Sequence, residues 1–220
     1  MEDKMTGLGK AVLFDCDGVL VDSEPALARI AAIALADFGA PAKPEDFKPY
    51  IGTGEDRYLG EVLKKYNVEY TQEVKQHVYE KYIELADDFV ESFAGVRELL
   101  EELKSSGYRM AVASSADMIK VEANLKVLAV SDNMFDAVIT GSDIERKKPF
   151  PDIYLLAADR CNVEPAMCYV VEDAVSGIQS AKAAGMTAIG FTSAHSADEL
   201  REAGADYIID SMTELMAVLK

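Results

Sequence analysis

The chain has 220 residues, half of them hydrophobic, and its 39 acidic and 22 basic residues give a formal net charge of −17. This length accommodates one large or two modest domains with a sizeable core. The negative charge repels nucleic-acid backbones and anionic membranes, and no basic stripe interrupts it, so we expect neither nucleic acid nor a membrane as a partner.

The N-terminus and the cysteines both bear on the compartment. No apolar stretch approaches the roughly 18 to 20 residues of a membrane span, and the first residues lack the basic and apolar regions of a signal peptide. Cys16, Cys161 and Cys168 form no CxxC pair and have no histidines at zinc-ligand spacing. We therefore expect a cytoplasmic monomer with free thiols, and leave open whether a longer precursor carried a targeting segment.

Short apolar runs alternate with helical stretches along the chain. The predicted strands are residues 11–14, 109–113, 136–139, 168–171, 187–191 and 206–209. Apolar runs separated by helices are typical of parallel strands that are buried on both faces. The sequence therefore predicts an α/β fold with a doubly wound, Rossmann-like parallel sheet, whose ligands bind at the carboxyl ends of the strands.

The long segment between the first two strands is predicted to be helical. Residues 24–38 are rich in alanine with apolar residues three and four positions apart, and residues 71–86 have a similar character. Long inserts beside a site are often lids, although a helical decoration that only adds stability is the alternative. The predicted domains are an α/β core of residues 1–22 and 90–220 and a small helical cap of residues 23–89.

Two carboxylates follow the first predicted strand. Asp15 and Asp17 are two positions apart, and side chains with this spacing on an extended chain point to the same side. One carboxylate can attack phosphorus while the other transfers a proton, and Gly18 permits a tight turn. Cys16 is expected to face the packing of the sheet. The alternative is a strand followed by an ordinary Asp-Gly turn.

Polar residues also follow two later strands. Ser114 comes where a strand runs into a helix, and N–H groups at a helix N-terminus bind anions; the alternative is helix capping by Ser115 or Asp117. Glu172 and Asp173 follow the strand 168–171. Paired carboxylates repel each other unless a cation lies between them, and Mg²⁺ prefers oxygen ligands. Acidic residues are also common at helix starts, which is the alternative here.

The basic segment 146–148 contrasts with the acidic chain around it. Within it we select Lys148, because the following Pro149 favours an extended backbone that aims the ammonium. The other two charges are expected to be solvated at the surface.

Taken in order, these segments resemble the motifs of haloacid dehalogenase-like phosphohydrolases, and the resemblance covers essentially the whole chain. Residues 11–23 match the first motif, hhhhDxDGxLxDS, in which h is apolar. The resemblance implies that Asp15 is the nucleophile of an aspartyl-phosphate mechanism and that Asp17 is the acid and base. It assigns phosphate binding to Ser114 and Lys148 and Mg²⁺ binding to Asp15, Asp17 through its carbonyl, Asp173, and Glu172 directly or through water.

Within that family the chain is most similar to the β-phosphoglucomutase branch, which carries a helical cap. The mutases place a histidine ten residues after the acid/base aspartate, where Leu27 stands, and an arginine in the cap loop, where residues 54–55 align. A mutase must hold its bisphosphate intermediate while it excludes water, and the loss of these two cap contacts weakens the case for a mutase. We therefore expect a magnesium-dependent phosphatase of a small phosphorylated metabolite, a sugar phosphate. The alternatives are a sugar phosphomutase and a non-catalytic binding or regulatory module.

Substrate choice is expected to depend on the cap. Glu24, Thr53 and Arg57 are the candidates to contact the polar end of a sugar phosphate. Arg57 can pair with a second phosphate, or it can be an exposed helix arginine beside an acidic neighbour. Residues 51–55, 113–117 and 120–125 also resemble the corresponding domain of plant suppressor-of-quenching proteins.

Overall fold

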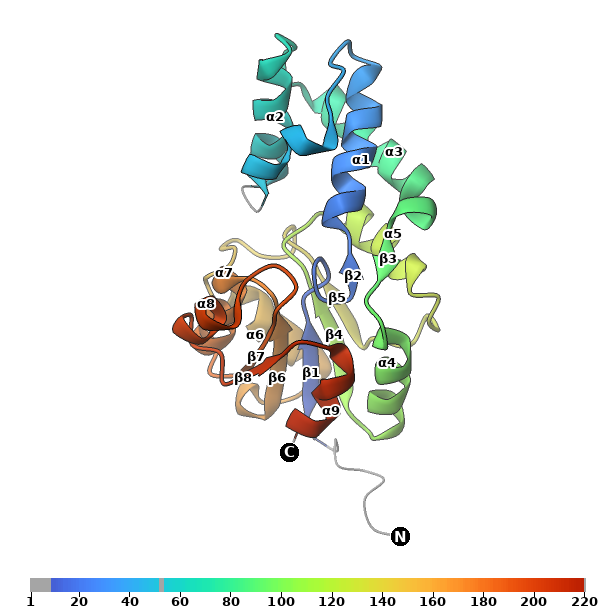
Figure 1. The fold of residues 1–220 in the computed structure, drawn as a ribbon. Coiled ribbons are helices and arrows are strands. Elements are labelled where there is room, and N and C mark those ends of the chain that lie inside the picture. Colours follow the sequence, from blue (N-terminus) through green and yellow to red (C-terminus); the bar gives the residue numbers. More distant parts are fainter. Residues whose placement is uncertain (1–8, 52–53, 220) are drawn as a thin grey trace.

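A parallel sheet forms the centre of the molecule (Figure 1). The structure is a computed structural model that describes residues 9–51 and 54–219. Within these ranges the main sheet has six strands in the order β5-β4-β1-β6-β7-β8, all paired in parallel. The strands are β1 (Ala11–Phe14), β4 (Arg109–Ala113), β5 (Ala137–Ile139), β6 (Cys168–Glu172), β7 (Thr187–Phe191) and β8 (Tyr207–Ile209). The predicted doubly wound α/β fold is confirmed.

Helices cover both faces of this sheet, and the alternation of side chains along β1 shows why. Val12 and Phe14 pack in one hydrophobic cluster, whereas Ala11 and Leu13 pack in a second cluster on the opposite face. The first face is covered by α4 (Val96–Ser105), α5 (Met118–Val127) and α9 (Leu215–Val218), and the second by α6 (Asp152–Cys161), α7 (Val175–Ala183) and α8 (Ala197–Glu202). Burial on both faces explains why the strands are continuously apolar.

A separate group of helices lies above the sheet in Figure 1. These cap helices are α1 (Glu24–Ala36), α2 (Glu55–Lys65) and α3 (Gln72–Phe89). They share a hydrophobic cluster of their own, which includes Leu35, Phe47 and Leu63. Helix α3 packs against both α1 and the core helix α5. The division of the chain into a core and a cap at residues 23–89 stays a prediction.

Short elements complete the chain. Strands β2 (Val21–Asp22) and β3 (Glu91–Ser92) pair antiparallel where the chain passes between the sheet and the cap helices. The 3₁₀-helices are η1 (Pro44–Asp46), η2 (Lys48–Tyr50), η3 (Pro165–Met167) and η4 (Met212–Glu214). None of the helices in the described ranges has the length and apolar character that crossing a membrane requires.

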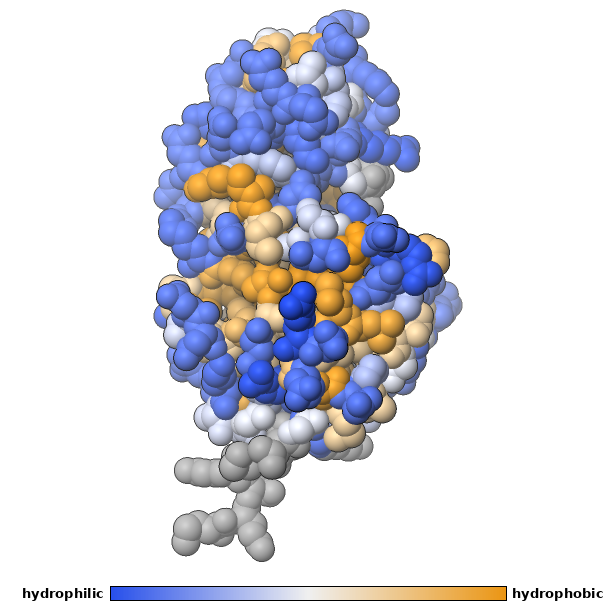
Figure 2. Space-filling view, turned by 180° about the vertical axis from the view of Figure 1, so that it is seen from behind, coloured by the Kyte–Doolittle hydropathy of each residue, from blue (hydrophilic) through white to orange (hydrophobic). Residues whose placement is uncertain are grey.

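One face of the molecule carries a broad hydrophobic band. Seen from behind in Figure 2, hydrophilic residues cover most of the cap helices, and hydrophobic residues extend across the middle of the molecule below them. Apolar atoms contribute more than half of an ordinary protein surface, so the band alone identifies no partner.

Candidate active site

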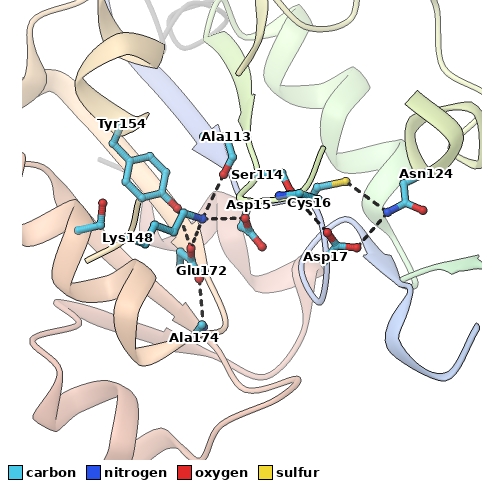
Figure 3. Close-up of polar contacts among 12 residues, drawn as sticks. Asp15, Cys16, Asp17, Ala113, Ser114, Asn124, Lys148, Tyr154, Glu172 and Ala174 are labelled. Atoms are coloured by element: carbon cyan, nitrogen blue, oxygen red, sulfur yellow. Dashed lines mark hydrogen bonds and ion pairs between the residues drawn. The ribbon is translucent and has the colours of Figure 1, made fainter. Parts of the chain in front are cut away.

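The predicted site residues come from neighbouring strands. Asp15 directly follows β1, Ser114 follows β4, and Glu172 and Asp173 lie at the end of β6. Because β4, β1 and β6 are adjacent and parallel, their carboxyl ends meet at one edge of the sheet. Lys148 reaches the same place from the loop before α6 (Figure 3). We call Asp15, Lys148, Glu172 and Asp173 the strand-end cluster.

Lys148 connects two of the carboxylates of this cluster. Its Nζ donates to Asp15 Oδ1 at 2.7 Å, to Glu172 Oε1 at 2.5 Å and to the Ala113 carbonyl at 3.1 Å. Burial lowers the pKa of Lys148, but the charges of Asp15 and Glu172 outweigh it and raise that pKa well above its ordinary value. Burial raises the pKa of Asp15 to about 7, although the Lys148 ammonium opposes the shift. The ammonium therefore stabilises the ionised form of Asp15.

Three carboxylates of the strand-end cluster can hold a cation. Oxygen atoms of Asp15, Glu172 and Asp173 lie within 4.8 Å of one another, and all three residues are buried. Burial, together with the charges of Glu172 and Asp15, raises the pKa of Asp173 well above its ordinary value. A cation would remove this repulsion, and a donor set made of carboxylate oxygens suits Mg²⁺. The residues present thus fit the predicted metal.

Glu172 is held by several donors. Its Oε1 accepts hydrogen bonds from Lys148 and from the Tyr154 hydroxyl at 2.8 Å, and its Oε2 accepts one from the Ala174 N–H at 3.0 Å. A Cβ at Gly177 would overlap the Glu172 carboxylate. The glycine at the start of α7 therefore makes room for this side chain.

The carboxylate of Asp17 is held by a different set of residues. Its Oδ1 accepts hydrogen bonds from Ser23 Oγ and from Asn124 Nδ2 at 3.0 Å. Lys120 Nζ lies 3.0 Å from the same oxygen, whereas Oδ2 accepts a long hydrogen bond of 3.5 Å from Ser114 Oγ. Burial raises the pKa of Asp17, but Lys120 and these hydrogen bonds outweigh it, so that the pKa is lowered. Asp17 is therefore ionised at neutral pH.

The turn that follows Asp17 has the conformation that the Asp-Gly sequence predicts. Gly18 has φ +77°, and a Cβ at this position would overlap the Asp173 carboxylate. The hydroxyl of Ser193, in the loop after β7, donates to the Gly18 carbonyl and to Asp173 Oδ2 at 3.3 Å. Cys16 is fully buried in the hydrophobic cluster on one face of the sheet, as predicted. The turn is thus fitted closely against Asp173.

The predicted alternative for the segment around Ser114, helix capping by the side chain of Ser115 or Asp117, is not observed. Ser114 Oγ accepts a hydrogen bond from the Ala116 N–H at 3.2 Å, so that it supports the turn into α5. Asp117 occupies the N-cap position of α5, but its side chain makes no capping hydrogen bond there. It accepts a hydrogen bond from Tyr79 of α3 at 2.8 Å and lies 3.5 Å from Lys75 Nζ. Asp117 therefore joins the core to a cap helix.

A cavity of about 620 Å³ lies between the end of the sheet and the cap helices. It is lined by Asp17, Ser115, Ala116, Asp117, Lys120, Lys147, Lys148 and Ser176 of the core, and by Glu24, Leu27, Tyr50, Ile51, Gly54, Glu55, Asp56, Arg57, Tyr58 and Lys75. Glu24 and Arg57, two of the three candidates for substrate binding, are among these lining residues, and their contact with a substrate stays a prediction. Thr53, the third candidate, lies outside the described residues. Burial raises the pKa of both Glu24 and Glu55.

Several residues around the site were not predicted. Lys120 and Asn124 contact Asp17, Tyr154 contacts Glu172, and Ser193 contacts Asp173. The four-residue spacing of Lys120 and Asn124 could have indicated a polar face on α5. For Tyr154 and Ser193 we find no such local signal, because the first contact joins helix α6 to strand β6 and the second joins two loops.

Comparison with known proteins agrees with this geometry. The sequence profile of "Haloacid dehalogenase-like hydrolase" matches residues 12–191. The chain is 32% identical to phosphorylated carbohydrates phosphatase of Thermotoga maritima over 96% of this chain and 98% of that protein. It is 30% identical to hexitol phosphatase B of Escherichia coli K12 over 94% of each.

Two further similarities differ in coverage. The chain is 40% identical to SUPPRESSOR OF QUENCHING 1, chloroplastic, of Arabidopsis thaliana over 94% of this chain, but it spans only 20% of that protein. A crystal structure from Thermotoga maritima, provisionally described as a β-phosphoglucomutase, superimposes with a TM-score of 0.82 at 30% identity. That superposition covers 96% of this chain and 98% of the other, so the cap helices belong to the shared fold.

Proposed function

The chain belongs to the haloacid dehalogenase-like hydrolase family and is a phosphoric monoester hydrolase, and from this premise we propose that it is a Mg²⁺-dependent phosphatase of a sugar phosphate. The observation that carries the proposal is the strand-end cluster, in which Asp15 is buried beside Lys148 and two further carboxylates. The predicted cytoplasmic location and monomeric state of the protein remain part of the proposal.

Asp15 and Asp17 divide the bond-making and proton-transfer roles. An Asp15 oxygen attacks phosphorus and the bond from phosphorus to the substrate oxygen breaks, while a proton on Asp17 passes to that oxygen. In the second step Asp17 takes a proton from water, the water oxygen attacks phosphorus, and the bond to Asp15 breaks. Lys120 favours the ionised, basic form of Asp17, and the negative phosphoryl group of a bound substrate favours its protonated, acidic form.

Asp15, Asp173 and the Asp17 carbonyl are the groups that would hold Mg²⁺. Both oxygens of Glu172 already accept hydrogen bonds, which favours its contact with the metal through water over direct ligation. When bound, Mg²⁺ supplies positive charge that lets an anionic phosphate approach an anionic nucleophile.

Ser114 and Lys148 bind the transferring phosphoryl group. Lys148 lies 2.7 Å from the nucleophilic carboxylate, so one ammonium can contact both Asp15 and a phosphoryl oxygen. Ser114 lies at the end of the neighbouring strand and already contacts Asp17. Because that hydrogen bond to Asp17 is long, at 3.5 Å, the hydroxyl can turn and donate to the phosphoryl group instead.

Glu24 and Arg57 contact the organic part of the substrate, together with Glu55. Glu24 and Glu55 line the cavity and can accept hydrogen bonds there. Their carboxylates favour a substrate with hydroxyl groups over one with a second anionic group. The cap candidates also include Thr53. Leu27 lines the cavity at the position where mutases place a histidine, and it can neither donate nor accept a proton. This arrangement supports hydrolysis over phosphoryl transfer to a second sugar position.

The test is phosphate release from a panel of phosphorylated metabolites with Mg²⁺. We expect turnover of hexose or hexitol phosphates that stops when the cation is chelated. No release from the panel or from p-nitrophenyl phosphate would favour a non-catalytic binding or regulatory module. A sugar phosphomutase is the second candidate because of the Thermotoga maritima structure. Conversion of glucose 1-phosphate to its 6-phosphate isomer, without free phosphate, would favour it.

A further inference from the structure

We propose that Lys120 and Asn124 are positioning residues, which fix one oxygen of Asp17 so that the other, Oδ2, transfers the proton. The inference rests on the proposed hydrolysis, in which Asp17 is the acid and the base. It concerns residues that lie outside the segments that resemble the family's motifs.

The two aspartates have separate lysine partners. Lys148 pairs with Asp15 at 2.7 Å from the loop before α6, whereas Lys120 pairs with Asp17 at 3.0 Å from helix α5. Both lysine side chains are nearly inaccessible, with 7% exposure for Lys148 and 9% for Lys120. Burying an ammonium is costly unless it is paired, so each lysine is bound to its own carboxylate.

Asn124 binds the same oxygen as Lys120. The two residues are one turn apart on α5, which places their side chains on one face of a rigid helix. Asn124 is fully buried, and its Nδ2 donates to Asp17 Oδ1 at 3.0 Å. Ser23 also donates to Oδ1. Three donors therefore converge on this oxygen and fix the plane of the carboxylate.

A cap helix fixes the orientation of the Asn124 amide. The Tyr82 hydroxyl of α3 donates to Asn124 Oδ1 at 2.6 Å, and Tyr82 is only 1% exposed. With its oxygen occupied by this donor, the amide must present its NH₂ group to Asp17. The Lys120 ammonium also lies 6.0 Å from the centre of the Tyr82 ring. Helix α3 thus helps to hold Asp17, the proposed acid, in place through Asn124 of α5.

The second oxygen of Asp17, Oδ2, is available for proton transfer. Among the described residues, Oδ2 has the single long hydrogen bond from Ser114 Oγ at 3.5 Å, and Asp17 lines the cavity. Ser114 follows the strand beside Asp15, so Oδ2 is directed toward the place where the phosphoryl group binds. A carboxylate held by one oxygen can exchange a proton at the other without losing its orientation.

The experiment compares leaving groups in the Lys120→Met and Asn124→Ala variants. A nitrophenolate leaves without a proton, whereas an alkoxide leaves only with one, so misplacing the acid slows leaving-group departure only for the alkoxide. The later hydrolysis of the aspartyl-phosphate, in which Asp17 is the base, is common to both substrates and does not enter kcat/KM. For a hexose or hexitol phosphate we expect kcat/KM to fall by about 10²-fold. For p-nitrophenyl phosphate the fall should stay below about tenfold. A role in overall folding alone would lower both values alike.

Lys126→Met is the matched control on the same helix. Its side chain is 70% exposed and pairs with Asp87, so both kcat/KM values should stay unchanged. Equal losses with both substrates, which indicate a role in folding, would overturn the proposal, and so would a rise in KM alone, which would assign Lys120 to substrate binding. If Lys120→Met does not fold, as judged by thermal unfolding, Asn124→Ala and Asn124→Ser decide the question. If the unmodified chain releases phosphate from neither substrate, the proposed hydrolysis fails instead.

Discussion

The strand-end cluster and the exposed surface of the cap helix α2 hold their charges in opposite ways. Lys148 and Glu172 are 7% and 1% exposed, and each has several hydrogen-bond partners. On α2, the Lys64–Glu61 pair is 71% and 34% exposed. Buried charges have one stable arrangement because any other leaves them unpaired, whereas exposed charges can rearrange in water. Under the proposed function we therefore expect the sheet to fix the reacting groups, while the contacts between the cap and the substrate can vary.

The largest effect is expected from Asp15→Asn, which removes the proposed nucleophile of the strand-end cluster. Phosphate release from the best substrate should fall by at least about 10⁴-fold. Asp87→Asn on α3, where the side chain is 55% exposed, should leave the rate unchanged. Activity of the Asp15 variant within tenfold of the parent would show that another group attacks phosphorus.

Lys148→Met should destabilise the protein much more than a matched substitution of an exposed lysine on α2. Removing this ammonium leaves Asp15 and Glu172 buried without their partner, so unfolding by urea should show a loss of about 3 to 5 kcal/mol. The matched variant Lys64→Met, on the exposed pair of α2, should change stability by less than about 0.5 kcal/mol. Similar losses in both variants would contradict the contrast drawn between buried and exposed charges.

Mg²⁺ should stabilise the strand-end cluster by compensating its carboxylates. At a concentration about 100 times the dissociation constant, the added stability is about 2.7 kcal/mol. Thermal unfolding with and without Mg²⁺ measures it, and Asp173→Asn should abolish most of the difference. An exposed substitution, Asp198→Asn, serves as the control, since that side chain is 90% exposed. An equal Mg²⁺ effect in both variants would argue against a site at Asp173.

The smallest effect is expected on the cap side. Glu24→Gln weakens an acceptor that lines the cavity, so KM for the sugar phosphate should rise by roughly tenfold while kcat for p-nitrophenyl phosphate is retained. Glu61→Gln on the outer surface of α2 should change neither constant. If Glu24→Gln instead lowers kcat for both substrates, Glu24 acts on the reacting centre and the division between core and cap is wrong.

Local patterns were sufficient for the sheet and for the motif residues. The apolar runs predicted six strands, and the observed strands differ from them by one residue at most at either end. Asp15, Ser114, Glu172 and Asp173 were identifiable because each directly follows or ends a strand. Helix ends were less certain: α1 ends at Ala36 instead of residue 38, and α3 continues to Phe89 instead of residue 86. Fraying and packing decide such ends, and neither is visible in a repeat pattern.

By itself, the sequence determined the parallel sheet and the group of residues at its carboxyl edge, because a strand's burial and the residue that follows it are local properties. Only the tertiary structure decided which groups hold Asp17. Asn124 is 107 positions away from it along the chain, and Tyr82 reaches Asn124 across 42 positions. Such contacts depend on how α3, α5 and the first loop pack together, and no spacing within a single segment specifies that packing.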